Sequence, residues 1–441
     1  MTTVTHLSKT LQALLTQTAN DLARTTGFTQ RASKVTGAVF AQGTVLGWLS
    51  NPEATLEELT QGLAAVDVTL SPQGLENRFS PQAAELLKQL LARAAQQLIS
   101  VDPVAIPLLQ RFQGIYLQDS TTITLPNDLA AEWRGCGGKA GSGAAAVKVQ
   151  LQFDLSGGGI SHLVVQHGRE SDRKAALQLA PLPAGALRLA DLGYFNLAVF
   201  EALEKQDVYW LSRYHVQVKV RDEGGHPLNL LAWLSRQTTP QIDCPIQLSD
   251  SHPLPCRLIA VRVPASVAAE RRRRLRRAAR DKGQTVSRLS LQLAAWTLFV
   301  TNVPRAKLSV EEALVLGRCR WQIELLFDLW KTHGQVDQSR SRQPWRILCE
   351  VYAKLLAMVI QHWVLLVSCW HYPNRSWRKA SKTIRRYASQ MLTALRVRTQ
   401  LEKVIRLIQK CLTTGCRINK RKAIPHAFQL LLAFPAENAL A

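Results

Sequence analysis

Three carboxylates stand in segments that are otherwise apolar. They are Asp119 in IYLQDST, Asp191 in LRLADLGYF and Glu324 in GRCRWQIELLFDLWK. A charged side chain among apolar residues costs free energy unless a partner compensates it. A hydrogen-bonded Asp at the end of a strand would explain Asp119 or Asp191 alone, but three such residues indicate a shared site. Because converging carboxylates repel one another, that site needs a cation.

The ligand types at this site favour a particular class of metal. Oxygen ligands without Cys or His are typical of Mg²⁺ or Mn²⁺ sites rather than zinc sites. Two such ions, about 3.5–4 Å apart, can activate a nucleophile and stabilise the leaving oxygen in phosphoryl transfer. We therefore predict that Asp119, Asp191 and Glu324 are catalytic residues that hold two Mg²⁺ or Mn²⁺ ions.

Two cations share a helix face with Glu324. At about 100° per residue, Arg320, Glu324 and Lys331 fall within roughly 40° of one another around the helix axis. Arg320 and Lys331 would then bind phosphates, Arg through bidentate contacts and Lys as a point charge. The alternative is an ordinary surface ion pair between Arg320 and Glu324, which are four residues apart.

The hydrophobic pattern predicts how these residues are positioned. Residues 1–100 have helical periodicity, strand-like alternation begins near residue 112, and the chain is again helical after Pro304. Asp119 and Asp191 are expected at strand ends. We predict an α/β fold with a catalytic domain over 101–370, a β-rich insertion over about 216–295, and a basic helical region over 371–441.

The charge of the chain indicates a polyanionic partner. The net charge is +23, and residues 371–441 contain 15 Lys or Arg against 2 Asp or Glu. Nucleic acid is the first candidate and an anionic membrane surface the second, although a solvated basic helix is the alternative for residues 371–441. Ser71 and Pro72 predict a helix start, and the two helices around it resemble a helix-turn-helix that would offer Arg78 to DNA. An ordinary helical bundle fits that pattern equally well.

Other features limit the location and the cofactor. The eight cysteines form no C-x-x-C pair, so a zinc ribbon is not expected and a reducing cytoplasm is the simplest location. No membrane partner is expected, because the most apolar run, residues 355–370, contains Gln361 and His362 and suits a core helix. The run RGCGGKAGSG fails both nucleotide-loop patterns and is predicted to be a flexible loop.

At these positions the sequence resembles the DDE transposases of the insertion-sequence-four family, which includes the transposon-five enzyme. The resemblance covers most of the chain and is strongest in QDSTT, GCGGKAG, LADLGYF, WTLFVTNVP and RWQIELLFDLWK. That family has a signature of Tyr, Arg, Glu and Lys at fixed spacing, and Arg320, Glu324 and Lys331 match its last three positions. Gly317 stands at the Tyr position, and Asp328 stands where members often have a Lys. The phosphate contact of that Tyr is therefore missing or comes from another residue.

The resemblance implies an RNase H-like mixed sheet interrupted by a β-rich insertion and flanked by helical regions. It also implies cut-and-paste transposition: the enzyme nicks the transposon end, the freed 3′-OH forms a hairpin, and the opened end attacks target DNA. Family members act as dimers on paired ends. A Trp at the point of Trp296 stacks on a flipped base in relatives that form hairpins, although a core aromatic is the simpler interpretation from the residues alone. Arg213 is a further candidate for DNA contact.

Two other functions remain open at this point. One is an RNase H-like nuclease without strand transfer. The other is a decayed or domesticated transposase that only binds DNA, which Gly317 and Asp328 favour and the three intact carboxylates oppose. When bound to DNA, a cytoplasmic protein of this kind would be associated with the nucleoid.

Overall fold

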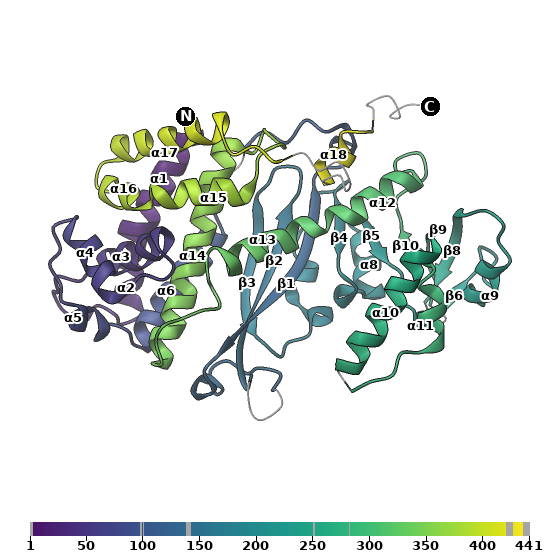
Figure 1. The fold of residues 1–441 in the computed structure, drawn as a ribbon, viewed down its shortest axis with the longest axis horizontal. Coiled ribbons are helices and arrows are strands. Elements are labelled where there is room, and N and C mark those ends of the chain that lie inside the picture. The colour runs from purple at the N-terminus through teal and green to yellow at the C-terminus, as the bar shows by residue number, and fades with distance from the viewer. Residues whose placement is uncertain are drawn as a thin grey trace. The chain divides into compact units, whose positions relative to one another are not determined.

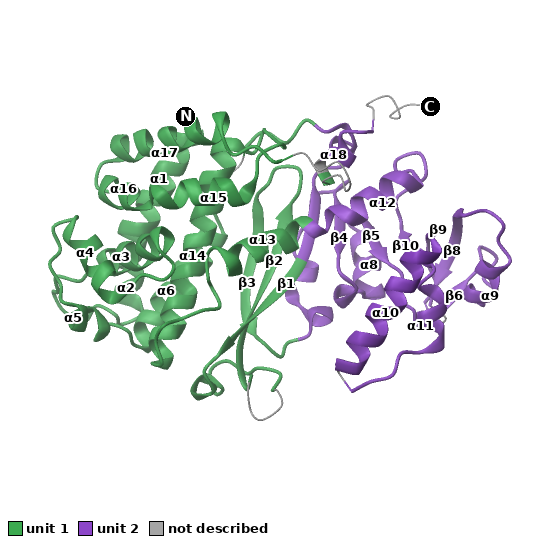
Figure 2. Ribbon diagram, in the orientation of Figure 1, with its two compact units in different colours: residues 1–105, 119–170, 322–428 green, residues 106–118, 171–321, 429–441 purple. Residues whose placement is uncertain are grey.

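The strands of the protein join in one ten-stranded sheet in a computed structural model that describes residues 3–97, 99, 101–137, 143–249, 252–281, 283–419 and 427–434 (Figure 1). The chain divides into two units (Figure 2). Unit 1 contains residues 1–105, 119–170 and 322–428, and unit 2 contains 106–118, 171–321 and 429–441. Each unit is therefore built from segments that are far apart in the sequence. In the loop RGCGGKAGSG, residues 138–142 lie outside the described residues.

The first five strands of the chain form a mixed sheet in the order β3-β2-β1-β4-β5. Their bounds are β1 Ile115–Leu125, β2 Ala145–Asp154, β3 Ile160–His167, β4 Leu187–Ala190 and β5 Tyr209–Arg213. Strand β4 is parallel to both β1 and β5, whereas β2 and β3 form an antiparallel hairpin. This mixed α/β arrangement confirms the predicted RNase H-like fold class.

The β-rich insertion extends the same sheet beyond β5, in the order β10-β9-β8-β6-β7. Its strands are β6 Val220–Arg221, β7 Pro227–Leu228, β8 Gln241–Leu248, β9 Leu254–Arg262 and β10 Trp296–Thr301, and its helices are α9 Leu230–Ser235, α10 Ala265–Asp281 and α11 Arg288–Leu293. The sequence pattern predicted strand in the α9 and α11 segments, and this was wrong. Asn229 and Ser287 each accept a hydrogen bond from a backbone N–H of the first turn, which starts a helix in place of a strand.

Unit 1 encloses a long helix, α14 Pro344–Cys369, which packs against α3, α6 and α17. Its described side chains from Leu348 onward are buried, as the core-helix prediction for residues 355–370 required. By length and composition this helix could cross a membrane, but its most apolar 18-residue stretch is entirely buried inside the protein.

Shorter helices complete the two units. The N-terminal helices of unit 1 are α1 Thr3–Ala13, the π-helical turn Leu14–Thr18, α2 Ala19–Thr25, α3 Gly37–Ser50, α4 Leu56–Ala64, α5 Pro72–Glu76 and α6 Pro81–Ala95. Later helices are α7 Pro107–Gln110, α8 Leu197–Glu204, α12 Val310–Cys319, α13 Trp321–Thr332, α15 Trp377–Arg386, α16 Ala388–Ala394, α17 Arg398–Thr414 and α18 Ala427–Leu431.

Buried polar groups in α14 have partners within unit 1. The Nε2 atom of His362 lies 2.6 Å from the carbonyl oxygen of Gly158, which fits a neutral ring that donates its proton to that carbonyl. Lys354 forms an ion pair with Glu350 at 2.7 Å, and both side chains are nearly inaccessible to solvent. Burial lowers the pKa of His362 to about 4 despite the Gly158 contact, so the ring stays neutral at neutral pH.

Candidate active site

Asp119 lies inside strand β1, not at its end as the sequence pattern predicted. The strand continues because Thr122 and Thr124 alternate with the buried residues Ile123 and Leu125. Asp119 is partly buried, and its Oδ1 accepts a hydrogen bond of 2.8 Å from the backbone N–H of Ser120. A carboxylate in the middle of a strand has a fixed backbone, which suits a residue that must hold a ligand in place.

Asp191 lies directly after strand β4, as predicted. In the parallel pairing of β1 and β4, the last register partners are Gln118 and Ala190. Asp119 and Asp191 are the next residues along these two neighbouring strands. In unit 2, Arg320 Nη2 lies 3.8 Å from Asp191 Oδ1, so a mostly buried guanidinium stands beside the half-exposed carboxylate.

Glu324 occupies the first turn of α13 and is partly buried. The helix buries the apolar residues that the pattern identified, Ile323, Leu326, Phe327, Leu329 and Trp330. Leu325 is an exception, because it is 44% exposed, and Trp321 at the start of the helix is 58% exposed. Trp321 was not among the predicted site residues, although helical periodicity places it on the polar side of α13, near Glu324.

Lys331 connects α13 to strand β1 inside unit 1. Its Nζ donates a hydrogen bond of 3.1 Å to the carbonyl oxygen of Thr122, which is three residues beyond Asp119. Unit 1 thus brings the helix of Glu324 to the strand of Asp119. Lys331 has a structural contact in addition to the phosphate contact that we predicted for it.

The two departures from the family signature have structural explanations. A Cβ atom at Gly317 would lie 2.3 Å from the ring of Phe299, so the space for a side chain at this position is filled from β10. Asp328, one turn after Glu324, forms an ion pair of 2.8 Å with Arg378 of α15. Phe299 therefore lies next to Gly317, and Arg378 lies next to Asp328, each from a different element of the chain.

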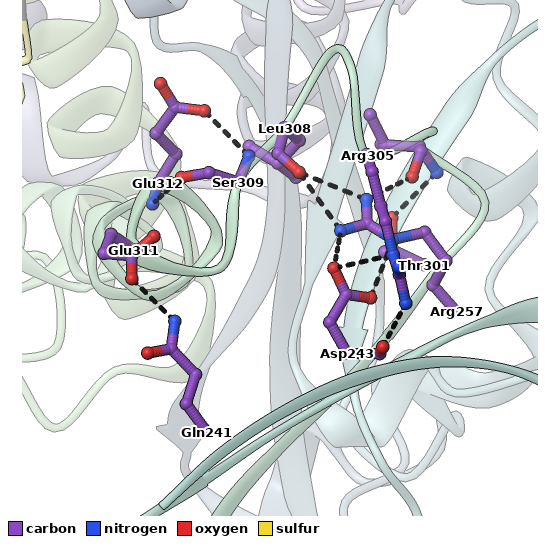
Figure 3. Close-up of polar contacts among 10 residues, drawn as sticks. Gln241, Asp243, Arg257, Thr301, Arg305, Leu308, Ser309, Glu311 and Glu312 are labelled. Carbon is purple, nitrogen blue, oxygen red and sulfur yellow. Dashed lines mark hydrogen bonds and ion pairs between the residues drawn. The ribbon is translucent and has the colours of Figure 1, made fainter. Parts of the chain in front are cut away.

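The segment that leads to Arg320 is fixed by polar contacts with the insertion (Figure 3). Arg257 of β9 donates to both carboxylate oxygens of Asp243 in β8, at 3.1 and 2.6 Å. The same guanidinium donates to the carbonyl oxygens of Val303 and Leu308, which lie between β10 and α12. Arg305 adds an ion pair to Asp243 at 3.2 Å. The insertion therefore holds the connection from which α12 begins.

Three sets of contacts stabilise the start of α12. Ser309 and Glu312 form a capping box, in which the Ser309 hydroxyl accepts from Glu312 N–H and the Glu312 carboxylate accepts from Ser309 N–H. Gln241 of β8 donates to Glu311 at 2.6 Å. Arg111 forms an ion pair with Glu312 at 2.9 Å, and both side chains are largely buried. Arg320 follows the last residue of this helix, so its position depends on these contacts.

The remaining DNA-contact candidates occupy varied environments. Trp296 begins β10 and is 8% exposed, within the apolar cluster of unit 2 and against the guanidinium of Arg262, as the core interpretation required. Arg213 ends β5 and is exposed. Arg78 follows α5 and donates to the Ser33 hydroxyl at 3.0 Å. The predicted Ser71 cap and Pro72 start of α5 are confirmed, but α5 has only five residues, which is short for a recognition helix.

The oxygen donors Asp119, Asp191 and Glu324 suit Mg²⁺ or Mn²⁺ in chemical type. Among the residues that the structure describes, no group of three or more His, Cys, Asp or Glu is close enough together to hold a metal ion. Asp119 and Glu324 belong to unit 1, and Asp191 belongs to unit 2.

Basic side chains gather on two helices. On α10, Arg271 donates to the carbonyl oxygen of Trp296 and to the hydroxyl of Thr297, and Arg272 donates to the carbonyl oxygen of Leu291. The other arginines of this helix are exposed, and we call them the α10 arginine face: Arg273, Arg274, Arg276, Arg277 and Arg280. On α15, five Lys or Arg residues occur without any acidic residue.

Comparisons with known proteins agree with this architecture. Residues 110–360, more than half of the chain, match the family model described as Transposase DDE domain. The transposase for insertion sequence element IS231F from Bacillus thuringiensis subsp. israelensis is 29% identical over 364 residues, which are 77% of this chain and 75% of that protein. The transposase for insertion sequence element IS1151 from Clostridium perfringens is 22% identical over 370 residues, 79% of this chain and 78% of that protein.

Among solved structures, the piggyBac transposase synaptic complex with hairpin DNA aligns with a TM-score of 0.48 and 9% identity, over 94% of this chain and 86% of that chain. The match to the family model spans β1, β4 and α13, which carry or adjoin all three candidate carboxylates. The resemblance inferred from the sequence is thereby confirmed, and the protein belongs to the Transposase DDE domain family, whose members act on DNA by phosphoryl transfer.

Proposed function

We propose that this protein catalyses cut-and-paste transposition of the DNA element that encodes it, with Asp119, Asp191 and Glu324 as its catalytic residues. The observation that carries the proposal is the β1–β4 register, because Asp119 and Asp191 directly follow the last pair of two adjacent parallel strands. The parallel pairing of β1 with β4 within unit 2 thus ends at the same point of both strands, immediately before the two aspartates. The position of Glu324 in the first turn of α13, within the matched family region, supports its place as the third carboxylate.

The three carboxylates would hold two Mg²⁺ or Mn²⁺ ions, which supply charge for activating the attacking hydroxyl and stabilising the leaving oxygen. The protein itself would position the DNA. Arg320, next to Asp191, has a fork of N–H donors that fits a phosphate, and Lys331 adds a positive charge near β1. The first product would be a nick at the transposon end with a free 3′-OH. That hydroxyl would then attack the opposite strand, and after hairpin opening it would attack target DNA.

The partners follow from the same reaction. Paired transposon ends require two active sites, so we propose a homodimer on DNA, and no membrane is involved. The protein would work in the cytoplasm and would be associated with the nucleoid when it is bound to DNA. The α10 arginine face and the basic C-terminal helices would contribute sequence-independent contacts with the DNA backbone.

A cleavage assay tests this function. The substrate is duplex DNA that carries the terminal inverted repeats flanking the gene, with Mg²⁺ as the metal. Asp119→Ala, Asp191→Ala and Glu324→Ala should each abolish nicking and leave binding to the same duplex nearly unchanged. Glu201→Ala is the matched control, because this exposed carboxylate of α8 forms a surface ion pair with Lys205, and the variant should cleave normally.

The outcomes separate the alternatives. Nicking without joining of the 3′-OH to a target plasmid would indicate an RNase H-like nuclease. Binding of the inverted repeat without any nicking by the wild-type protein would indicate a decayed transposase that only occupies DNA ends. Normal nicking by Glu324→Ala would overturn the assignment of the third carboxylate.

A further inference from the structure

The face of α13 that bears Glu324 has a second helix beside it within unit 1. Asp328 lies one turn after Glu324 and roughly 40° from it around the helix axis. Arg378 Nη2 of α15 donates to Asp328 Oδ2 at 2.8 Å. At the other end of α15, Arg385 donates to the carbonyl oxygen of His333, directly after α13, at 3.1 Å. Helix α15 therefore lies alongside the second half of α13.

The position of α15 is fixed by its buried side. Ala380, Ser381 and Ile384 are buried, and the Ser381 hydroxyl donates to Gln361 of α14 at 2.7 Å. Arg378, Lys382 and Arg385 lie on an adjoining side of the helix and fall within roughly 60° of one another at 100° per residue. A rigid backbone thus presents three cations in a row next to the helix of Glu324.

The ion pair between Arg378 and Asp328 is expected to contribute little to the free energy of folding. Both side chains remain largely exposed, with 61% of Arg378 and 47% of Asp328 accessible to solvent. Exposed ion pairs of this kind contribute little to folding free energy. The single hydrogen bond to Asp328 also uses only one of the N–H donors of the guanidinium, so most of its donors can still bind another anion.

Asp328 does determine where the guanidinium points. Burial would raise the pKa of Asp328, but hydrogen bonds from Arg378 and Thr332 outweigh it and lower the pKa, so the carboxylate is charged at neutral pH. A charged carboxylate one turn from Glu324 keeps Arg378 over this face of α13. An arginine that is oriented before binding loses less conformational freedom when it contacts a phosphate.

We propose that Arg378, oriented by Asp328, binds a backbone phosphate of the DNA strand near the reacting phosphate, and that Lys382 and Arg385 extend this contact along α15. The inference rests on the proposed function, because DNA must lie across the Glu324 face of α13. It adds a specific DNA-binding residue outside the signature of Arg320, Glu324 and Lys331. Asp328 is a positioning residue in this arrangement.

The first test compares matched variants on one helix. Arg378→Gln removes the proposed contact. Lys379→Gln removes the same charge from the next residue, whose Nζ is directed instead to the carbonyl oxygen of Arg417 and the side chain of Asn419. Binding to the duplex with the terminal inverted repeat is measured over a range of salt concentrations. Arg378→Gln should weaken binding about tenfold and reduce the salt slope by about 0.9, the value for one phosphate contact. Lys379→Gln should change both quantities less.

The second test is a rescue. Asp328→Lys combined with Arg378→Gln returns a cation to the same place from α13, and it should restore most of the lost binding and nicking. A residue with only a structural role would not be rescued, because the double variant lacks the original ion pair entirely. Circular dichroism and thermal unfolding of each variant check that the fold is retained.

The third test locates the phosphate. Neutral methylphosphonates are placed one at a time near the nick site of the duplex. One of them should weaken binding of the wild-type protein severalfold and have no further effect on Arg378→Gln, because the charge pair is already lost. If every methylphosphonate affects both proteins equally, or if Arg378→Gln behaves as Lys379→Gln does, the inference is wrong. Failure of the proposed function is a separate result, since there the wild-type protein binds the duplex and does not nick it.

Discussion

Among the residues of unit 2, Arg257 is the one whose replacement should most weaken the attachment of the segment before Arg320 to the β-rich insertion. Its guanidinium bonds with Asp243 of β8 and with the carbonyl oxygen of Leu308 (Figure 3). It also donates to the carbonyl oxygen of Val303. Only 11% of the Arg257 side chain and 17% of the Asp243 side chain are exposed. Arg257→Met keeps the apolar stem and removes all of these hydrogen bonds at once.

The size of the effect follows from burial. Removing one partner of a buried ion pair costs about 3–5 kcal/mol, because the other charge is left without compensation. Asp243 keeps its ion pair with Arg305 and some solvent contact, so we expect a value near the lower limit, about 3 kcal/mol. Arg305→Met is the matched control. Its side chain is 59% exposed, and such pairs contribute about 1 kcal/mol or less.

Native-state hydrogen exchange is a suitable assay, because a protein with two units need not unfold in a single transition. Amides of β9, β10 and α12 should exchange with a free energy of opening about 2 kcal/mol lower in Arg257→Met than in Arg305→Met, which is roughly a thirtyfold difference in the opening constant. Nicking by Arg257→Met should fall as well, since α12 leads directly to Arg320. Equal protection of the two variants would show that the Arg257 network does not hold this connection.

Three further predictions concern charge, acidity and packing. Changing the whole α10 arginine face to Gln should weaken binding to unrelated DNA sequences and flatten its salt dependence, whereas Arg271→Gln, which loses its bonds to Trp296 and Thr297, should lower the melting temperature instead. The neutral state of His362 in the native protein means that only the unfolded chain binds this proton between pH 6.5 and about 4. Stability should therefore fall as the pH drops through this range, by up to about 3 kcal/mol in urea denaturation, and His362→Gln should reduce that loss. Trp296→Ala should destabilise unit 2 by about 3 kcal/mol because its ring is buried, and a folded Trp296→Phe that nicks normally but fails to form hairpins would instead support base stacking.

The features that local patterns encode were predictable from the sequence. Strand β1, the position of Asp191 after β4 and the amphipathic helix of Glu324 all follow from residue alternation or helical periodicity within about ten residues. The same reasoning misplaced Asp119 at a strand end, whereas the strand continues because Thr122 and Thr124 alternate with the buried residues Ile123 and Leu125. Short helices such as α11 were missed because a cap and a single turn do not establish a period.

The features that depend on partners far along the chain were not predictable. The sequence around Trp296 is the same whether its ring stacks on DNA or packs in the core. Only the three-dimensional structure shows that the ring lies against the guanidinium of Arg262. The network around Arg257 joins β8, β9 and the segment before α12, which no pattern within one element could connect.

The two departures from the family signature are the strongest example of this limit. From the sequence, Gly317 and Asp328 are losses, since one removes an aromatic hydroxyl and the other replaces a positive charge with a negative one. In the structure, the ring of Phe299 fills the space at Gly317, so restoring a Tyr there alone would create a clash before it created a phosphate contact. At Asp328 the negative charge is paired with Arg378, fifty residues away, which places a guanidinium beside the position that lost its cation. A sequence signature is matched one position at a time. A DNA phosphate interacts with the charge at the protein surface, whichever helix carries that charge. Under the proposed role of Arg378, we expect activity to depend on positions 328 and 378 together, so that a substitution at either one has to be interpreted with its partner.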